Sequence, residues 1–292
     1  MIDLAALTRR RIAEPQAIAG AWQTRLPATR PADGRILLIA ADHPARGALT
    51  VRGEPRMADR RELLGRLATA LSRPGVDGVL GTPDILEDLL LAGLLEGKLV
   101  IGSMNRGGLQ GATFEFDDRF TAYDVPTIVN HNLDGGKMLT RIALDDAGSA
   151  STLEASGAAV TALATARKLA LVEPFLSARR GVRRVENLLD PDSVIASIAI
   201  ASGLGASSAY TWLKLPVVGE MERVLTATTL PTLLLGGDPA GDPDRTYAGW
   251  AAALAIPPAA GLVVGRALLY PPDDDVAAAV DTAARLVHGD RK

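Results

Sequence analysis

Lysines are the side chains of this sequence that could act as amine nucleophiles, and the chain has only five of them against 26 arginines. An arginine stays protonated, whereas a desolvated lysine can lose its proton. Lys98 and Lys168 stand at the beginnings of predicted strands and Lys292 is the last residue, so we interpret these three as solvated amines. Lys137 and Lys214 lie within apolar strand patterns, and they are the candidates for Schiff-base chemistry.

Lys214 lies in the apolar and aromatic stretch TWLKLP. An apolar setting or a neighbouring cation lowers the pKa of an ammonium group, so part of the population is a free amine near neutrality. We therefore predict that Lys214 is a nucleophile, although a structural ion pair with Glu173 or an aspartate explains the same pattern equally well. Glu173 closes the preceding strand and is the candidate acid/base; its alternative is a rim residue fixed by Pro174.

The composition excludes several other kinds of site. The absence of cysteine excludes disulfides, thiolate metal sites and cysteine nucleophiles. Only three histidines occur, so we expect no metal site and no cofactor. A formal net charge of -3 gives no basic surface for nucleic acid or an anionic membrane. Because the first residues lack the order of a secretory signal and no apolar run could span a bilayer, we expect a cytoplasmic protein.

Eight apolar strand patterns alternate with helical patterns along the chain. We predict a helical extension over residues 1–33 and one barrel domain over 34–292. Strand–helix alternation implies right-handed βαβ units and a parallel sheet, and eight units match a (β/α)8 TIM barrel of the α/β class. A doubly wound open sheet is the alternative. The predicted strands cover 36–42, 76–81, 98–103, 135–146, 168–175, 210–215, 231–238 and 261–266.

Two of these strands end in glycine turns of the kind that bind phosphate. In such barrels the chemistry lies at the carboxyl ends of the strands, and the loops after the seventh and eighth strands commonly bind phosphate through backbone N–H groups. Here those turns contain Gly237 and Gly265. Arg266 follows at once and could add a charge-assisted hydrogen bond. The sequence therefore predicts a phosphate site at this edge of the barrel.

Three other polar or aromatic features have less specific interpretations. His43, between Asp42 and a proline, is interpreted as a hydrogen-bonding residue that contacts substrate rather than as a metal ligand. The run FEFDDRF, 114–120, has the look of a carboxylate metal cluster, but we interpret it as a solvated loop. Trp212 is interpreted as barrel packing.

Five short motifs, taken in order, resemble class I aldolases. They are ADHPARGAL after the first strand, VEPF on the fifth, WLKLP on the sixth, Gly-Gly on the seventh and VVGRALL on the eighth. This set is similar to the Schiff-base aldolase superfamily that contains the deoxyribose-phosphate, tagatose-bisphosphate and archaeal-type fructose-bisphosphate aldolases. The resemblance covers residues 36–270, which is most of the chain.

The resemblance implies a role for several residues. Lys214 corresponds to the Schiff-base lysine, and Glu173 to the acid/base of the tagatose-bisphosphate branch. Asp42 corresponds to the aspartate that assists carbinolamine chemistry and orients the lysine. Lys137 corresponds to the second active-site lysine of that branch. The turns that would contact phosphate are those of Gly237, Gly265 and Arg266.

Together these features lead us to expect a metal-independent class I aldolase, a carbon–carbon lyase, that acts on a phosphorylated keto-sugar or keto-acid and forms a homo-oligomer. Lys137 or Arg141 would hold an oxyanion or depress the pKa of Lys214. Similar actinobacterial barrel proteins resemble the aldolase of inositol breakdown, which splits a phosphorylated deoxy-keto-gluconate into dihydroxyacetone phosphate and malonate semialdehyde. The alternatives are a phosphosugar barrel enzyme without a Schiff base, such as an isomerase or a metal-dependent aldolase, and a metabolite-binding regulatory barrel without turnover.

Overall fold

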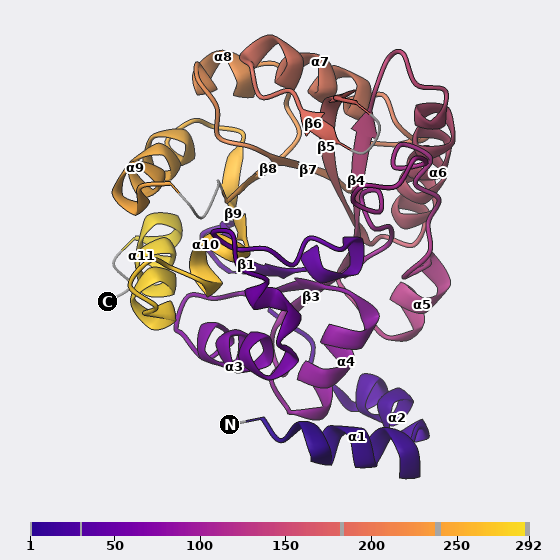
Figure 1. The fold of residues 1–292 in the computed structure, drawn as a ribbon, viewed down its shortest axis with the longest axis vertical. Helices are drawn as coiled ribbons and strands as arrows, with labels where there is room; N and C mark the ends of the chain where they lie inside the picture. Colours follow the sequence, from indigo (N-terminus) through magenta and orange to yellow (C-terminus); the bar gives the residue numbers. More distant parts are fainter. Residues whose placement is uncertain (1, 30, 182–183, 237–240, 290–292) are drawn as a thin grey trace.

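The computed structural model describes residues 2–29, 31–181, 184–236 and 241–289, and over these residues eight parallel strands close into a barrel (Figure 1). The strands follow one another around the barrel in the order β4-β3-β2-β1-β9-β8-β7-β5, and β4 also pairs with β5, which closes the ring. The predicted (β/α)8 barrel is confirmed, and the open-sheet alternative is wrong. The barrel strands are β1 Ile36–Ala41, β2 Gly78–Gly81, β3 Leu99–Ser103, β4 Gly135–Ile142, β5 Leu169–Arg179, β7 Thr211–Leu215, β8 Thr232–Leu235 and β9 Ala259–Val264.

The helical patterns that alternate with the predicted strands correspond to eight helices of the structure. They are α3 Arg60–Leu71, α4 Pro83–Leu91, α5 Val125–Asn130, α6 Gly148–Thr165, α7 Pro191–Ser202, α8 Met221–Leu225, α9 Pro243–Leu254 and α11 Val276–His288. Several smaller elements were not predicted from the sequence: the 3-10 turns η1 His43–Arg46 and η2 Arg56–Ala58, the short strand β6 Val185–Asn187 and the one-turn helix α10 Arg266–Leu269.

Aspartates begin many of the helices. An aspartate side chain before the first turn accepts a backbone N–H that has no partner within the helix. This arrangement stabilises the start of a helix by about 1 kcal/mol. It occurs at Asp3, Asp59, Asp124, Asp190, Asp242 and Asp275.

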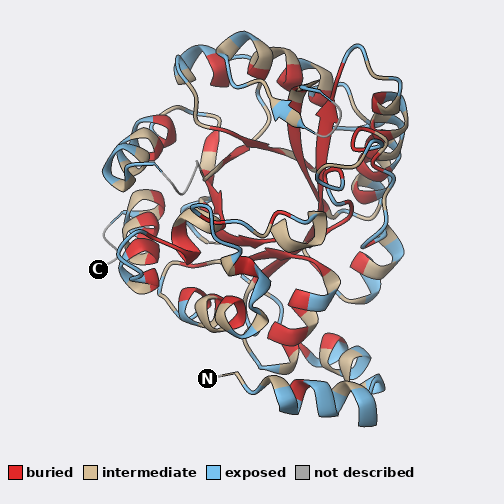
Figure 2. Cartoon of the chain, viewed as in Figure 1, coloured by how far each residue is buried: buried red, intermediate tan, exposed pale blue. Residues whose placement is uncertain are grey.

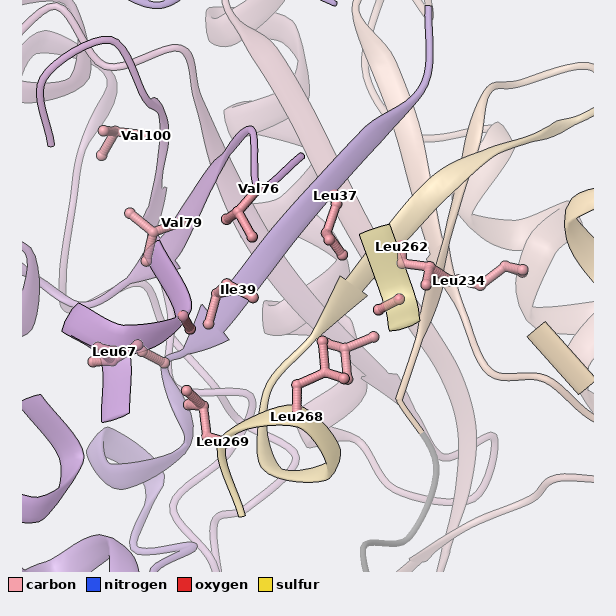
Figure 3. Packing of buried hydrophobic residues seen from close by; sticks show 14 of the residues in the cluster. Leu37, Ile39, Leu67, Val76, Val79, Val100, Leu234, Leu262, Leu268 and Leu269 are labelled. Carbon is pink, nitrogen blue, oxygen red and sulfur yellow. The ribbon is translucent and has the colours of Figure 1, made fainter. Parts of the chain in front are cut away.

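The barrel strands separate two apolar cores. Side chains alternate along a strand, so Leu37 and Ile39 of β1 face the surrounding helices, while Ile36 and Leu38 face the barrel interior. The outer core fills the space between strands and helices, where side chains such as Leu268 of α10 reach the strands (Figure 3). Both faces of the strands are therefore buried, whereas the outer sides of the helices are exposed (Figure 2). This burial explains the continuous apolar runs in the sequence.

The chain begins with two helices, α1 Leu4–Ala13 and α2 Gln16–Thr24, that lie outside the barrel next to α4 (Figure 1). Arg11 of α1 forms ion pairs with Glu87 and Asp88 of α4, at 2.9 and 3.0 Å. Trp22 of α2 is buried and stacks on His131, with ring centroids 5.3 Å apart. The predicted helical extension thus packs on the barrel wall. No helix in the described ranges is long and apolar enough to span a bilayer.

Arg25, directly after α2, is expected to be the main polar attachment of these helices. It is 5% exposed and donates hydrogen bonds to the carbonyl oxygens of Lys98 (2.9 Å) and Asn132 (2.8 Å). Arg25→Ala should lower the free energy of unfolding by about 2–4 kcal/mol, because it removes two hydrogen bonds from a buried charged group to part-buried carbonyl oxygens. Urea denaturation measures this loss, with Arg10→Ala on the exposed side of α1 as the control. A loss below about 1 kcal/mol would contradict this role.

Candidate active site

Lys214 lies near the carboxyl end of a buried strand, with its side chain among polar groups inside the barrel. It belongs to β7 and pairs in register with Leu233 of β8. The residue is 4% exposed, and its Nζ lies 3.1 Å from Oε2 of Glu173. The ion pair that the sequence left open for Lys214 is therefore present.

A second lysine reaches the same carboxylate. Lys137 of β4 has its Nζ 2.7 Å from Oε2 of Glu173 and donates a hydrogen bond of 2.7 Å to Oδ2 of Asp42. Glu173 lies on β5, which is hydrogen-bonded to β4 on one side and to β7 on the other. The four residues form a continuous buried chain, Asp42–Lys137–Glu173–Lys214, which we call the ion-pair chain.

The pKa values of the two lysines in the ion-pair chain are shifted in opposite directions. Burial alone would lower the pKa of Lys137, but the two carboxylates beside it outweigh burial and raise that pKa. Burial also lowers the pKa of Lys214, and here it prevails, because among the described residues Glu173 is the one carboxylate within ion-pair distance of Lys214 and Lys137 repels the ammonium. Lys137 thus stays an ammonium ion, while Lys214 is the lysine that can become a free amine.

Both carboxylates of the ion-pair chain stay ionised. Burial would raise the pKa of Asp42 and Glu173, but the two lysines outweigh it. The pKa of Asp42 lies well below its ordinary value, and that of Glu173 falls to about 2. The ion-pair chain therefore contains two anions that can accept protons and at least one fixed cation.

His43 begins η1, directly after Asp42. Burial, assisted by Arg266 and Arg46 and only partly opposed by Asp42, lowers the pKa of His43 to about 3. Its imidazole is therefore neutral near pH 7. The Nδ1 atom lies 3.8 Å from Oδ1 of Asp42 and has no hydrogen-bond partner in the described part of the chain.

A cavity of about 130 Å³ opens beside Lys214. Gly265 lies at its wall, where a Cβ atom would be only 2.5 Å from the carbonyl oxygen of Ala40 and 2.9 Å from the ring of His43, so only glycine fits. Five of the predicted site residues line the cavity: Lys214, Glu173, His43, Gly265 and Arg266. Asp42 and Lys137 are not among the lining residues but join them through the ion-pair chain, and Gly237 lies outside the described residues.

Arg141 is held elsewhere. Its guanidinium forms a buried ion pair with Glu115, and Arg141 is not among the residues that line the cavity. The sequence allowed either Lys137 or Arg141 as the second cation beside Lys214. The contacts with Glu173 and Asp42 belong to Lys137.

The run FEFDDRF is not the solvated loop that we predicted. Glu115, Phe116 and Asp118 are 3%, 1% and 8% exposed. Glu115 is drawn inward by its pairing with Arg141, a partner 26 residues away that the local pattern could not reveal. In the described ranges, no group of three or more histidines, aspartates or glutamates could hold a metal ion.

The cavity also contains residues that we did not predict. Arg46, at the end of η1, lines it, as do Phe175 of β5 and Asn187 of β6. Arg46 lies within the motif ADHPARGAL, so its place at the site could have been predicted from that motif. Asn187 reaches the site only because β6 folds back antiparallel to the end of β5, where Asn187 accepts a hydrogen bond from Ser177. No sequence pattern indicated that β6 would pair with β5.

Comparisons with known proteins agree with this fold. The chain is 57% identical to Cgl0159 from Corynebacterium glutamicum, whose crystal structure matches with a TM-score of 0.95 over 98% of this chain and 97% of that chain. An archaeal fructose-1,6-bisphosphate aldolase whose catalytic lysine is covalently bound to a carbinolamine intermediate gives 0.65 at 18% identity, over 93% of this chain and 100% of its own. The fructose-bisphosphate aldolase of Slackia heliotrinireducens gives 0.66 at 15% identity, over 100% and 91%. No match was found among curated proteins.

The two aldolases confirm the predicted similarity to archaeal-type class I aldolases at the level of the fold. The family itself follows from the sequence, because the Cgl0159-like model matches residues 34–284. The chain belongs to the Cgl0159-like family.

Proposed function

We propose that the protein is a class I aldolase in which Lys214 forms a Schiff base with a ketone substrate. The observation that carries this proposal is the position of Lys214: it is buried, lines a cavity and contacts a carboxylate that a second lysine also holds. The lowered pKa of Lys214 supports its role as the attacking amine, since only the unprotonated form is nucleophilic.

Schiff-base formation would begin with a proton transfer from Lys214 to Glu173. The ammonium of Lys214 gives a proton to Glu173, and the free amine attacks the ketone carbon. The carbonyl oxygen takes up a proton from the attacking nitrogen to give a neutral carbinolamine. Glu173 then returns its proton to the departing hydroxyl, which leaves as water, and a cationic imine remains on Lys214.

Cleavage would use the same carboxylate as a base. Glu173 removes the proton from the hydroxyl group on the second carbon from the imine carbon, and the bond between that second carbon and the first carbon breaks. The aldehyde leaves and the bonding electrons reach the imine nitrogen, giving an enamine. Protonation of the enamine carbon and hydrolysis release the ketone and restore Lys214.

Lys137 and Asp42 would position these groups rather than react. Lys137, from β4 on the other side of β5 from β7, contacts Oε2 of Glu173 and lowers the pKa of that carboxyl group. Asp42 anchors Lys137 through a 2.7 Å hydrogen bond. A positive charge fixed beside the reacting atoms also stabilises an oxyanion as it develops.

The substrate we propose is a phosphorylated keto-sugar or keto-acid. Its phosphate would lie at Gly265 and Arg266, where the eighth barrel strand ends. The phosphorylated deoxy-keto-gluconate of inositol breakdown meets this description. Its ketone fragment would be dihydroxyacetone phosphate, which stays bound to the lysine after the carbon–carbon bond breaks and is released by hydrolysis.

The proposal predicts a covalent adduct. Incubation with dihydroxyacetone phosphate and borohydride should add the reduced phosphoketone to one lysine, and peptide mapping by mass spectrometry should place it on Lys214. Lys214→Met should give no adduct. If the wild-type protein forms no adduct with dihydroxyacetone phosphate or with a panel of keto-sugar phosphates, the Lys214–Glu173 pair is structural, and an enzyme without a Schiff base or a regulatory barrel becomes the better interpretation.

A further inference from the structure

Arg46 is a cation at the cavity that the proposed chemistry does not use. It is the last residue of η1 and lines the cavity together with Lys214 and Arg266. Its backbone is fixed: Gly47 ends the turn with a φ of 80°, and the carbonyl oxygen of Arg46 accepts a hydrogen bond of 2.9 Å from the backbone N–H of Gln110. The guanidinium is therefore carried on a defined turn at the mouth of the barrel.

Arg46 differs from the other cations around it because the described residues offer it no carboxylate. Lys137 and Lys214 contact Glu173, and Arg141 is paired with Glu115. Over the same residues no carboxylate oxygen lies within 4.0 Å of Arg46, and its buried Nη1 lacks a hydrogen-bond partner. A buried donor of a charged group that makes no hydrogen bond lowers the stability of a protein, so such donors are normally hydrogen-bonded to protein, water or a ligand.

The surroundings of Arg46 are positively charged. Arg46 helps to lower the pKa of Arg141 to about 10, after burial as the larger cause. Arg266 and Arg46 both disfavour protonation of His43. Cations that repel one another across a concave, partly buried surface attract anionic ligands. A guanidinium also matches the planar geometry of a carboxylate or phosphate by donating two parallel hydrogen bonds.

We propose that Arg46 binds a second anionic group of the substrate, so that the substrate carries one anion at the Arg266 edge of the cavity and another at Arg46. This inference rests on the proposed function for the position of the ketone, and it narrows the substrate class. A keto-sugar phosphate, which has one anionic group, would leave Arg46 unpaired, whereas a keto-acid phosphate or a bisphosphate, which has two, would satisfy it. Arg46 then selects substrates by the charge of this second group.

Equilibrium binding to two matched ligand pairs tests this selection. 6-Phosphogluconate and sorbitol 6-phosphate differ only in a carboxylate, and fructose 1,6-bisphosphate and fructose 1-phosphate only in a second phosphate. Calorimetry should show that, in at least one pair, the wild-type protein binds the ligand with two anionic groups about 10-fold or more tighter. A preference for 6-phosphogluconate identifies the second anionic group as a carboxylate. A preference for fructose 1,6-bisphosphate identifies it as a phosphate.

Variants connect this preference to Arg46. Arg46→Met should reduce this preference to less than about 2-fold, with affinity for the ligand that has one anionic group nearly unchanged, and Arg46→Lys should restore part of the preference. Arg119→Met, at an exposed arginine that is not among the lining residues, should behave as wild type. Equal binding within both pairs by the wild-type protein, or an undiminished preference in Arg46→Met, would overturn the proposal. 6-Phosphogluconate has no ketone, so its binding is independent of the borohydride experiment, and the two proposals can fail separately.

Discussion

Lys214→Met is expected to lower the rate of aldol cleavage at least about 10⁴-fold while the protein stays folded. The amine that would attack the ketone is lost, and loss of a nucleophile cannot be compensated by binding. Methionine occupies a similar volume, and removing a buried ammonium ion removes its desolvation cost. Glu173 keeps Lys137 as its partner, at 2.7 Å. Coupled detection of dihydroxyacetone phosphate, released from a phosphorylated deoxy-keto-gluconate or from fructose 1,6-bisphosphate, measures this loss.

Lys168→Met is the matched control for this prediction. Lys168 directly precedes β5, at the end of the barrel away from the cavity, and donates a hydrogen bond to Asn132. The same substitution there should leave turnover within about 2-fold of wild type, because a half-buried lysine outside the site contributes little. If Lys214→Met retains substantial turnover, Lys214 is not the nucleophile.

Lys137→Met is expected to cost both stability and activity. Lys137 is the cation that contacts both buried carboxylates, so its removal leaves Asp42 and Glu173 poorly compensated. Removing one partner of a buried ion pair typically costs about 3–5 kcal/mol. Urea denaturation at neutral pH should show a loss of this size, well above that of Lys214→Met. A loss below about 1 kcal/mol would mean that the ion-pair chain does not depend on Lys137.

The same variant separates a positioning role from a merely structural one. In the wild-type protein Lys137 helps to lower the pKa of Lys214. Without Lys137 the pKa of Lys214 should rise, so the limb of the pH–rate profile on which activity increases with pH should move to higher pH. Residual activity, or the rate of borohydride trapping if activity is too low, follows this shift. An unchanged limb together with reduced stability would assign Lys137 a structural role alone.

The barrel and the pair at its centre could be predicted from the sequence for simple physical reasons. Strands buried on both faces need continuous apolar residues, so a polar residue within such a run stands out. Lys214 and Glu173 stood out in this way. Because successive strands of a barrel are neighbours, their order in the sequence alone indicated that these two residues meet, and they do, at 3.1 Å.

The remaining contacts depend on side-chain conformations and loop paths that no short pattern encodes. Arg141 lies on the same strand as Lys137, yet a loop between β3 and β4 brings Glu115 to it and removes it from the cavity. Asn187 arrives through a strand too short to be recognised. Arg46 lies within one of the motifs, but what draws attention to it is that its buried Nη1 has no hydrogen-bond partner among the described residues.

The ion-pair chain has a further consequence for the energetics of turnover. Formation of the proposed imine replaces one cation on Lys214 by another at nearly the same place, beside a carboxylate that is already there. The local field therefore needs little reorganisation as the reaction proceeds, which is the property expected of a site preorganised for charged intermediates. Because these charges are buried, the field is also shielded from dissolved salt, so the chemical step should respond to ionic strength far less than substrate capture does.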